Sequence, residues 1–328
     1  MNKDIVLLME KKLVAILDNT FDDYKIEAEV LAPAGIKIEA LNIEDPGQHK
    51  KLEQEALGII VNLVPLKADT INTLQECRVI SRYGVGYDNV DINAATQKGI
   101  WVANVPDYCI HEIAEHTLAL LMGARRQIHV ADSGVRKGRW QLPTDFIQRL
   151  NGQTLGICGF GRAGQAFFKM VRTLGWSEIL IYDPFKQHEI TEQGGQYVSK
   201  EELLQRADVI TLHIPLSENT FHYLDKAAID NLKPHALVIN TSRGKVIDQE
   251  ALYQFLINNP NARAAVDVME TEPPEVSEKL FTLNNFLATP HMAYYSCESV
   301  IELKKKAALN VLDVLQNRPP KYPVNSLK

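Results

Sequence analysis

Residues 154–165, TLGICGFGRAGQ, decide the fold predicted for this chain. The apolar run TLGIC predicts a buried strand, and the segment after the glycines has the apolar spacing of a helix. Between them, Gly159, Gly161 and Gly164 have the spacing G-x-G-x-x-G. This order of strand, glycine turn and helix is typical of a doubly wound α/β domain.

The glycine turn is also suited to a phosphate group. Its first glycine permits the tight turn, its second lets a pyrophosphate approach the backbone, and its third lets helix and strand pack closely. The amides of Arg162 and Ala163 are expected to face the phosphates, because unpaired donors and the helix dipole favour an anion at a helix N-terminus. Glycine turns can also serve packing alone, so the turn by itself does not decide the function.

Asp183 ends the next apolar run, EILIYD, about 20 residues after the glycines, which is the spacing of dinucleotide-binding domains. An aspartate there accepts hydrogen bonds from an adenosine ribose, and its charge repels a 2′-phosphate. A turn aspartate before Pro184 is the structural alternative. The combined pattern favours NAD over NADP, although Lys186 lies close enough to weaken that preference.

Apolar runs of strand length alternate with helix-like segments along the chain, which predicts βαβ units and parallel sheets. Besides the strand before the glycines, the predicted strands cover residues 13–17, 58–64, 78–81, 100–105, 178–183, 207–215, 236–240, 263–268 and 286–290. A long helix is predicted after Pro106, with Asp107 as its N-cap. A last amphipathic helix is predicted over about residues 297–315.

Composition limits the class of protein. A chain of 328 residues with 45% apolar residues is long enough for two domains. A formal net charge of −6 lacks the basic excess that nucleic acid requires, so nucleic acid is not an expected partner. The apolar run within the start, MNKDIVLLMEKKL, is too short for the apolar core of a signal peptide, and no apolar run reaches the length of a membrane span. We therefore expect a cytoplasmic protein without a membrane partner.

Neither a metal site nor a disulfide framework is expected. The four cysteines, which form no CxxC pair, are scattered along the chain. The segment HEIAEH, residues 111–116, misses the HExxH spacing by one residue, so its two histidines lie well apart around a helix.

Polar residues near the ends of the later predicted strands are the candidates for chemistry, because ligands gather at the carboxyl ends of parallel strands. They are Arg243, Asp267, Glu272 and His291. Taken singly, each has an ordinary structural explanation as an ion pair, a core residue or a loop charge. Taken together they divide the labour of hydride transfer: His291 exchanges the hydroxyl proton, Glu272 orients and stabilises the protonated ring, and Arg243 clamps a carboxylate.

The chain resembles the D-isomer-specific 2-hydroxyacid dehydrogenase family over nearly its whole length. The matching motifs, in family order, are SRYGVGYDNVDI, ANVPDYCIHEIAEHTLAL, LGICGFGRAGQA, LHIPLSENT, VINTSRGKVID, AAVDVMETEPP and ATPHMAYYS. The resemblance implies an NAD-dependent oxidoreductase that interconverts a 2-oxo acid and a D-2-hydroxy acid. It also implies a Rossmann domain, residues 105–293, inserted into a flavodoxin-like α/β substrate domain made of residues 1–104 and 294–328.

The resemblance further assigns roles to residues of this sequence. The family's catalytic arginine, glutamate and histidine fall on Arg243, Glu272 and His291. The amides of Val85 and Gly86 are expected to hold the substrate carboxylate, in a site in the cleft between the domains. Asp267 is expected to bind the nicotinamide carboxamide, and the helix after Pro106 to help build a homodimer. The remaining residues expected to line the cofactor are Pro215, Thr220, Thr241 and Ser242.

Within the family, the motifs are most similar to the branch that includes the C-terminal-binding proteins. Arg82 matches a substrate-contacting arginine of that branch, whereas Tyr294 stands where those proteins have a tryptophan over the substrate. An NAD-sensing interaction protein is therefore an alternative function. Formate and phosphite dehydrogenases are a further one. Among organic acids, glyoxylate, hydroxypyruvate, precursors of 3-phosphoglycerate and branched 2-oxo acids all stay open.

Overall fold

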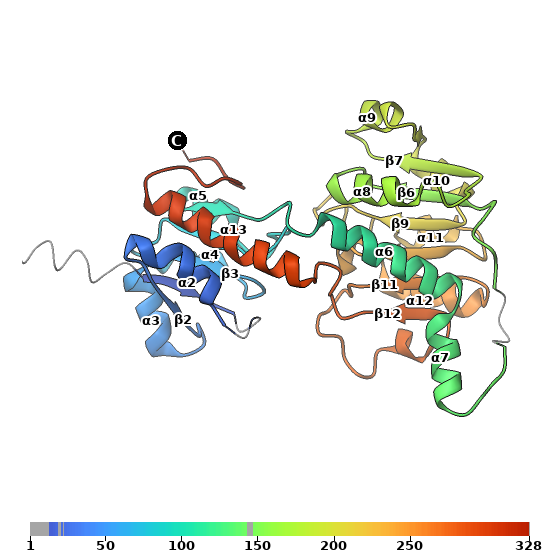
Figure 1. The fold of residues 1–328 in the computed structure, drawn as a ribbon, viewed down its shortest axis with the longest axis horizontal. Helices are drawn as coiled ribbons and strands as arrows, with labels where there is room; N and C mark the ends of the chain where they lie inside the picture. The colour runs from blue at the N-terminus through green and yellow to red at the C-terminus, as the bar shows by residue number, and fades with distance from the viewer. Residues whose placement is uncertain (1–12, 19–20, 22, 143–146, 328) are drawn as a thin grey trace, which may run out of the picture. The chain divides into compact units, whose positions relative to one another are not determined.

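The computed structural model describes residues 13–18, 21, 23–142 and 147–327. The chain forms two compact units (Figure 1). The first consists of residues up to Tyr108 together with residues from Ser296 onward, and the second of Cys109–Tyr295. The second unit is thus inserted into the first.

The first unit is built on five parallel strands in the order β2-β1-β3-β4-β5. In this order β2 is added on one side of β1, and β3, β4 and β5 are added on the other side. This is the strand order of flavodoxin-like folds. The strands are β1 (Leu13–Ile16), β2 (Lys37–Ala40), β3 (Ala56–Val61), β4 (Val79–Arg82) and β5 (Trp101–Ala103).

Helices cover both faces of this sheet. One core includes side chains of α3 (Pro46–Glu55), α4 (Ala68–Thr73) and α5 (Ile92–Gln97). On the other face, α13 (Cys297–Leu315) packs on β3 and β4 and lies beside α2 (Lys25–Leu31), as Figure 1 shows.

The second unit has a sheet of seven parallel strands in the order β12-β11-β10-β9-β6-β7-β8. The first strand of this unit, β6, lies between β7 and β9, so the chain winds outward in both directions as in a Rossmann fold. The strands are β6 (Thr154–Cys158), β7 (Glu178–Tyr182), β8 (Gln196–Tyr197), β9 (Val209–Leu212), β10 (Leu237–Asn240), β11 (Arg263–Val266) and β12 (Phe286–Ala288).

Two hydrophobic cores sandwich this second sheet. One contains side chains of α10 (Lys200–Arg206), α11 (Lys226–Asp230) and α12 (Gln249–Asn258). The other contains side chains of α6 (Ile110–Arg125), α8 (Arg162–Val171) and α9 (Gln187–Glu192). The fold class predicted from the sequence, α/β with doubly wound parallel sheets, is confirmed. None of the helices in the described part of the chain combines the length and apolar character needed to cross a membrane.

Some local predictions were incomplete or wrong. The strands β2 and β8 were missed, because both are short, lie at sheet edges and have largely exposed residues without an apolar run. Asp107 does not cap the long helix, since α6 begins at Ile110 without a side-chain cap. The Asp107 carboxylate instead accepts hydrogen bonds from Lys306 Nζ at 3.1 Å and Tyr322 Oη at 2.6 Å.

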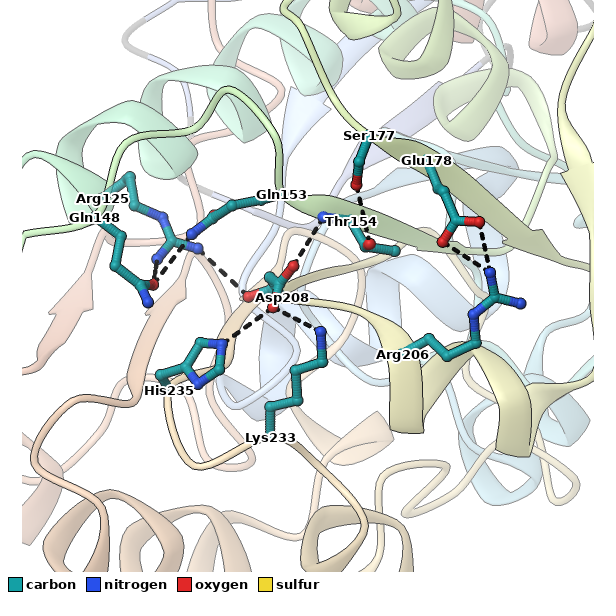
Figure 2. Close-up of polar contacts among 10 residues, drawn as sticks. All are labelled: Arg125, Gln148, Gln153, Thr154, Ser177, Glu178, Arg206, Asp208, Lys233 and His235. Atoms are coloured by element: carbon teal, nitrogen blue, oxygen red, sulfur yellow. Dashed lines mark hydrogen bonds and ion pairs between the residues drawn. The ribbon is translucent and has the colours of Figure 1, made fainter.

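The amino ends of the strands in the second unit are closed by a polar network (Figure 2). Asp208, just before β9, accepts hydrogen bonds from the Thr154 amide at 2.8 Å, Lys233 Nζ at 2.7 Å and His235 Nε2 at 3.0 Å. Burial opposes ionisation of Asp208, but these hydrogen bonds hold its pKa below the ordinary value. Arg206 pairs with Glu178 at 2.6 Å. The carboxylates of Asp208 and Glu178 are therefore both bound by side chains of the same chain.

Candidate active site

The glycine turn lies at the opposite, carboxyl edge of the same sheet, between β6 and α8. Gly159 has φ +92°, and a Cβ there would lie 2.4 Å from the carbonyl oxygen of His213. A Cβ on Gly164 would lie 2.2 Å from the Gly159 oxygen. Gly161 differs from both, because a Cβ there would meet no atom within 4 Å. Gly159 and Gly164 are thus required by the turn itself, whereas Gly161 faces open space.

The helix α8 begins at Arg162, with Gly161 at its N-cap position and no side chain capping it. The first-turn amides of Arg162, Ala163 and Gly164 have no partner within a helix, because hydrogen bonding starts one turn later. Such amides attract anions, and the open space over Gly161 leaves room for one to approach. The turn therefore fits the pyrophosphate of a dinucleotide.

Asp183 follows β7 and is already held by the backbone. Its Oδ2 accepts a hydrogen bond from the Phe160 amide at 2.8 Å, and its Oδ1 accepts one from the Phe185 amide at 2.9 Å. Each carboxylate oxygen has two acceptor positions, so Asp183 can still accept hydrogen bonds from ribose hydroxyls. The neighbouring Lys186 Nζ pairs with Glu189 Oε1 at 2.7 Å, so its charge is balanced locally.

Four more residues expected at the cofactor lie in loops after β9 and β10. Thr220 Oγ1 donates to the carbonyl of Pro215 at 2.6 Å. The Ser242 amide and hydroxyl both donate to Asn240 Oδ1, at 3.0 and 2.8 Å. Thr241 Oγ1 lies 3.0 Å from Thr117 Oγ1 of α6. These loops are fixed by internal hydrogen bonds.

His291 and Glu272 form a direct pair. The distance from His291 Nδ1 to Glu272 Oε2 is 2.6 Å, and about a third of each side chain is exposed, 34% in both cases. Glu272 Oε1 accepts a hydrogen bond from the Met269 amide at 2.9 Å. Burial opposes ionisation of Glu272, but the hydrogen bond from His291 and the charge of Arg243 hold its pKa below the ordinary value. The predicted histidine and glutamate are thus brought together across 19 residues of sequence.

Arg243 has an extended backbone conformation and directly precedes the short helix η2 (Gly244–Val246). Its Nη1 donates to the Ser242 carbonyl at 2.9 Å, and its own carbonyl accepts from Asn240 Nδ2 at 2.9 Å. A Cβ on Gly244 would lie 2.0 Å from the Met269 backbone, so the loop with Arg243 packs against the segment leading to Glu272. All three predicted catalytic residues therefore belong to one region of the second unit.

Asp267 is 1% exposed and binds the segment that contains His291. Its Oδ1 accepts from the Met292 amide at 2.9 Å, its Oδ2 from the Ala293 amide at 2.8 Å, and its carbonyl from the His291 amide at 2.8 Å. Burial opposes ionisation, but hydrogen bonds from His116, Thr289 and these amides hold the pKa of Asp267 below its ordinary value.

The expected substrate-binding residues divide between the two units. In the first, Arg82 ends β4 and is buried, and its guanidinium fills the space where a Cβ on Gly84 would stand. Beside it, Asn104 Nδ2 donates to the Val85 carbonyl at 2.7 Å and fixes the loop to which Gly86 belongs. In the second unit, the ring of Tyr294 packs edge-on against Tyr295 at 6.2 Å.

Two histidines near this site were not predicted to belong to it. His116, which the sequence raised only as a metal ligand, bonds to Thr289, whereas His213 is half-buried against the glycine turn, with both ring nitrogens shielded from solvent. Burial lowers the pKa of His213 to about 4, so this ring is neutral near pH 7. A usable signal for His116 was its place beside Thr117, on the helix face that packs toward the strands.

Comparison with known proteins identifies relatives of both units. Residues 118–293 match the family model described as D-isomer specific 2-hydroxyacid dehydrogenase, NAD binding domain. The chain is 36% identical over 266 residues to a glyoxylate reductase of Korarchaeum cryptofilum, with 80% of each chain covered. It is 35% identical to a D-3-phosphoglycerate dehydrogenase of Archaeoglobus fulgidus, with 90% of this chain and 55% of that one covered.

A solved structure agrees over both units. The D-lactate dehydrogenase of Aquifex aeolicus, complexed with NAD and lactic acid, is similar with a TM-score of 0.85 and 25% identity. The match covers 96% of this chain and 100% of that one.

Proposed function

Because the chain belongs to the D-isomer specific 2-hydroxyacid dehydrogenase family and is an NAD-dependent oxidoreductase, we propose that Arg243, Glu272 and His291 catalyse its reaction. The reaction interconverts a 2-oxo acid and a 2-hydroxy acid, and NAD supplies or accepts the hydride. The observation that carries the residue assignment is the 2.6 Å contact between His291 Nδ1 and Glu272 Oε2.

This contact holds a single proton, which lies on His291 Nδ1 and is donated to Glu272 Oε2. Glu272 is ionised near pH 7, so it accepts the proton on His291 Nδ1 and stabilises the charged ring. The Nε2 atom is then the one that exchanges a proton with the substrate oxygen. In the reducing direction His291 Nε2–H protonates that oxygen, and in the oxidising direction neutral Nε2 removes the hydroxyl proton.

The side chain of Arg243 has the shape to hold the substrate carboxylate. Its planar guanidinium can donate two parallel hydrogen bonds to a carboxylate and polarise the neighbouring C2 oxygen. Its backbone is fixed through Asn240 and its Nη1 through the Ser242 carbonyl. We assign the amides of Val85 and Gly86 as further donors to the substrate carboxylate, supported by the Asn104 contact that fixes their loop.

NAD is preferred over NADP in this proposal. Asp183 repels a 2′-phosphate, and the neighbouring cation Lys186 is paired with Glu189. Thr220, Thr241 and Ser242 line the rest of the cofactor, and Asp267 meets the nicotinamide amide.

A homodimer is also part of the proposal. Large apolar side chains are exposed on α6, on α7 (Ile128–Arg136) and in the loop after it, which is unusual for a surface that stays in water. They are Met122, Ile128, Val135, Trp140 and Leu142. A second copy would cover them, and sedimentation of a Trp140→Ser, Leu142→Ser variant should then show a smaller particle. None of the four cysteines forms a disulfide, which suits the reducing cytoplasm, and we propose the cytoplasm as the location.

The proposed function is tested by following NADH absorbance with a panel of 2-oxo acids. The panel contains glyoxylate, hydroxypyruvate, its 3-phosphate and branched 2-oxo acids. Turnover with at least one acid, lost in Arg243→Ala, is the expected result. NADH-dependent self-association without oxidation by any acid would contradict it and favour the NAD-sensing alternative.

A further inference from the structure

His116 connects the long helix α6 to the loop that carries His291. The distance from His116 Nε2 to Thr289 Oγ1 is 2.9 Å, and Thr289 Oγ1 donates to Asp267 Oδ1 at 2.6 Å. His116 Nε2 also lies 3.5 Å from Asp267 Oδ1. The His116 side chain is 18% exposed and that of Asp267 is 1% exposed, so water screens these contacts poorly.

The proton positions along this chain follow from the donors available. A threonine hydroxyl has one proton, and Thr289 gives it to Asp267. Thr289 Oγ1 therefore accepts from His116, and His116 Nε2 must carry a proton. The same Nε2–H points close to the Asp267 carboxylate, so His116 supports the buried charge both directly and through Thr289.

Asp267 in turn holds the backbone around His291. Its two carboxylate oxygens bind the amides of Met292 and Ala293, and its carbonyl binds the amide of His291. His291 has φ +52°, in the left-handed region that residues other than glycine adopt only where the surroundings require it. The hydrogen bonds to Asp267 hold His291 in this backbone conformation.

We propose that His116 is a positioning residue, which acts through Thr289 and Asp267 to keep the His291 imidazole in its reactive orientation. The proposal rests on the proposed role of His291. His116 touches neither substrate nor cofactor in it, and its effect is on the precision with which the 289–293 loop is held. A displaced general acid slows the chemical step more than it weakens binding.

The test uses the full-length protein and compares His116→Phe, which keeps a flat ring but has no donor, with His116→Gln, which has an amide donor. We expect His116→Phe to lower kcat about tenfold while KM and the Kd of NADH stay within about twofold. His116→Gln should restore kcat to within about threefold of the wild type. His49→Phe, a histidine on α3 of the first unit, is the control and should leave kcat unchanged.

A double-mutant cycle with Thr289→Val identifies the route. If His116 acts through Thr289, the variant with both substitutions should have about the same kcat as Thr289→Val alone, because His116→Phe then removes a contact that is already lost. Multiplying effects would overturn this route. Thr289→Val carries the same expectation of a lower kcat, so it serves alone if His116→Phe does not fold.

The outcomes separate this inference from the proposed function. A wild-type protein that oxidises NADH with a 2-oxo acid, together with an unchanged kcat in His116→Phe, overturns the role of His116 only. A kcat that falls equally in the Phe and Gln variants also overturns it, because the donor would then not matter. A wild-type protein without any turnover overturns both.

Discussion

At the amino edge of the seven-stranded sheet, Asp208 accepts hydrogen bonds from Lys233, His235 and a backbone amide, and Arg206 pairs with Glu178 (Figure 2). At the carboxyl edge, the first turn of α8 has no side-chain cap, and Glu272 and His291 are a third exposed. Both edges end buried parallel strands. At the first, the carboxylates of Asp208 and Glu178 have side-chain partners within the chain, whereas at the second the first turn of α8 is open to an anion.

This difference separates polar residues that stabilise the fold from those that serve a ligand. A buried polar group must be hydrogen-bonded, and at the amino edge the partners come from neighbouring elements. At the carboxyl edge the glycine turn keeps side chains away from the helix amides, which a dinucleotide can then bind. Substitutions at the two edges should therefore change different quantities.

The largest contrast is expected between two arginines. Arg243→Ala should lower kcat/KM by about a thousandfold, because it removes the bidentate clamp on the substrate carboxylate. Arg206→Ala, at the amino edge, should leave kcat/KM within about twofold. Steady-state NADH oxidation measures both, and equal losses in the two variants would remove the distinction between the edges.

Two glutamates give the next contrast. Glu272→Gln should lower kcat by about 10- to 100-fold, because a neutral amide stabilises protonated His291 less than a carboxylate does. Glu178→Gln should not change kcat. Since hydrogen bonding lowers the pKa of Glu272, the carboxylate should stay ionised in the wild type down to pH values below the ordinary glutamate pKa. A wild-type kcat that already falls between pH 7 and pH 6 through titration of Glu272 would contradict this.

Cofactor choice should change by a smaller factor. Asp183→Ala removes the charge that repels a 2′-phosphate, and Glu189→Gln removes the partner of Lys186. Together they should raise the ratio of kcat/KM for NADPH to that for NADH about tenfold. An unchanged ratio would show that neither residue faces the adenosine ribose.

At the amino edge the effect should appear in stability instead. Asp208→Asn should lower the free energy of unfolding by about 2 kcal/mol, because it replaces charge-assisted hydrogen bonds with neutral ones. The folded-state pKa of Asp208 is lowered, so this stabilisation is present above the unfolded pKa and is lost as the pH falls through the folded value. Chemical denaturation at pH 7 measures the difference, with kcat expected to stay constant. A large loss of kcat at unchanged stability would reverse the assignment of this edge.

The sequence predicted the parts of the fold that have a strong local pattern. The strands β6 and β10 are apolar runs. The motif G-x-G-x-x-G predicted the turn after β6, because only glycine fits at positions 159 and 164. The edge strands β2 and β8 had no such pattern, because their pairing depends on neighbours far along the chain.

The candidate site was predictable in its residue types and less so in its contacts. His291 and Glu272 could be proposed as partners from the chemistry each supplies. The bonds of Asp267 to the amides of Met292 and Ala293, 25 and 26 residues away, could not, because no local pattern pairs the ends of β11 and β12. Its contact with His116 could not either, because it joins the end of β11 to α6 across distant parts of the sequence. The domain boundaries, the homodimer and the resemblance to the C-terminal-binding protein branch stay predictions.

The most direct test of the central claim is His291→Ala, with kcat and the Kd of NADH measured on the same preparation. The account predicts that kcat falls by about a thousandfold or more, while NADH fluorescence titration gives a Kd within about twofold of the wild type. A variant that turns over at the wild-type rate would contradict the assignment of His291 as the proton donor.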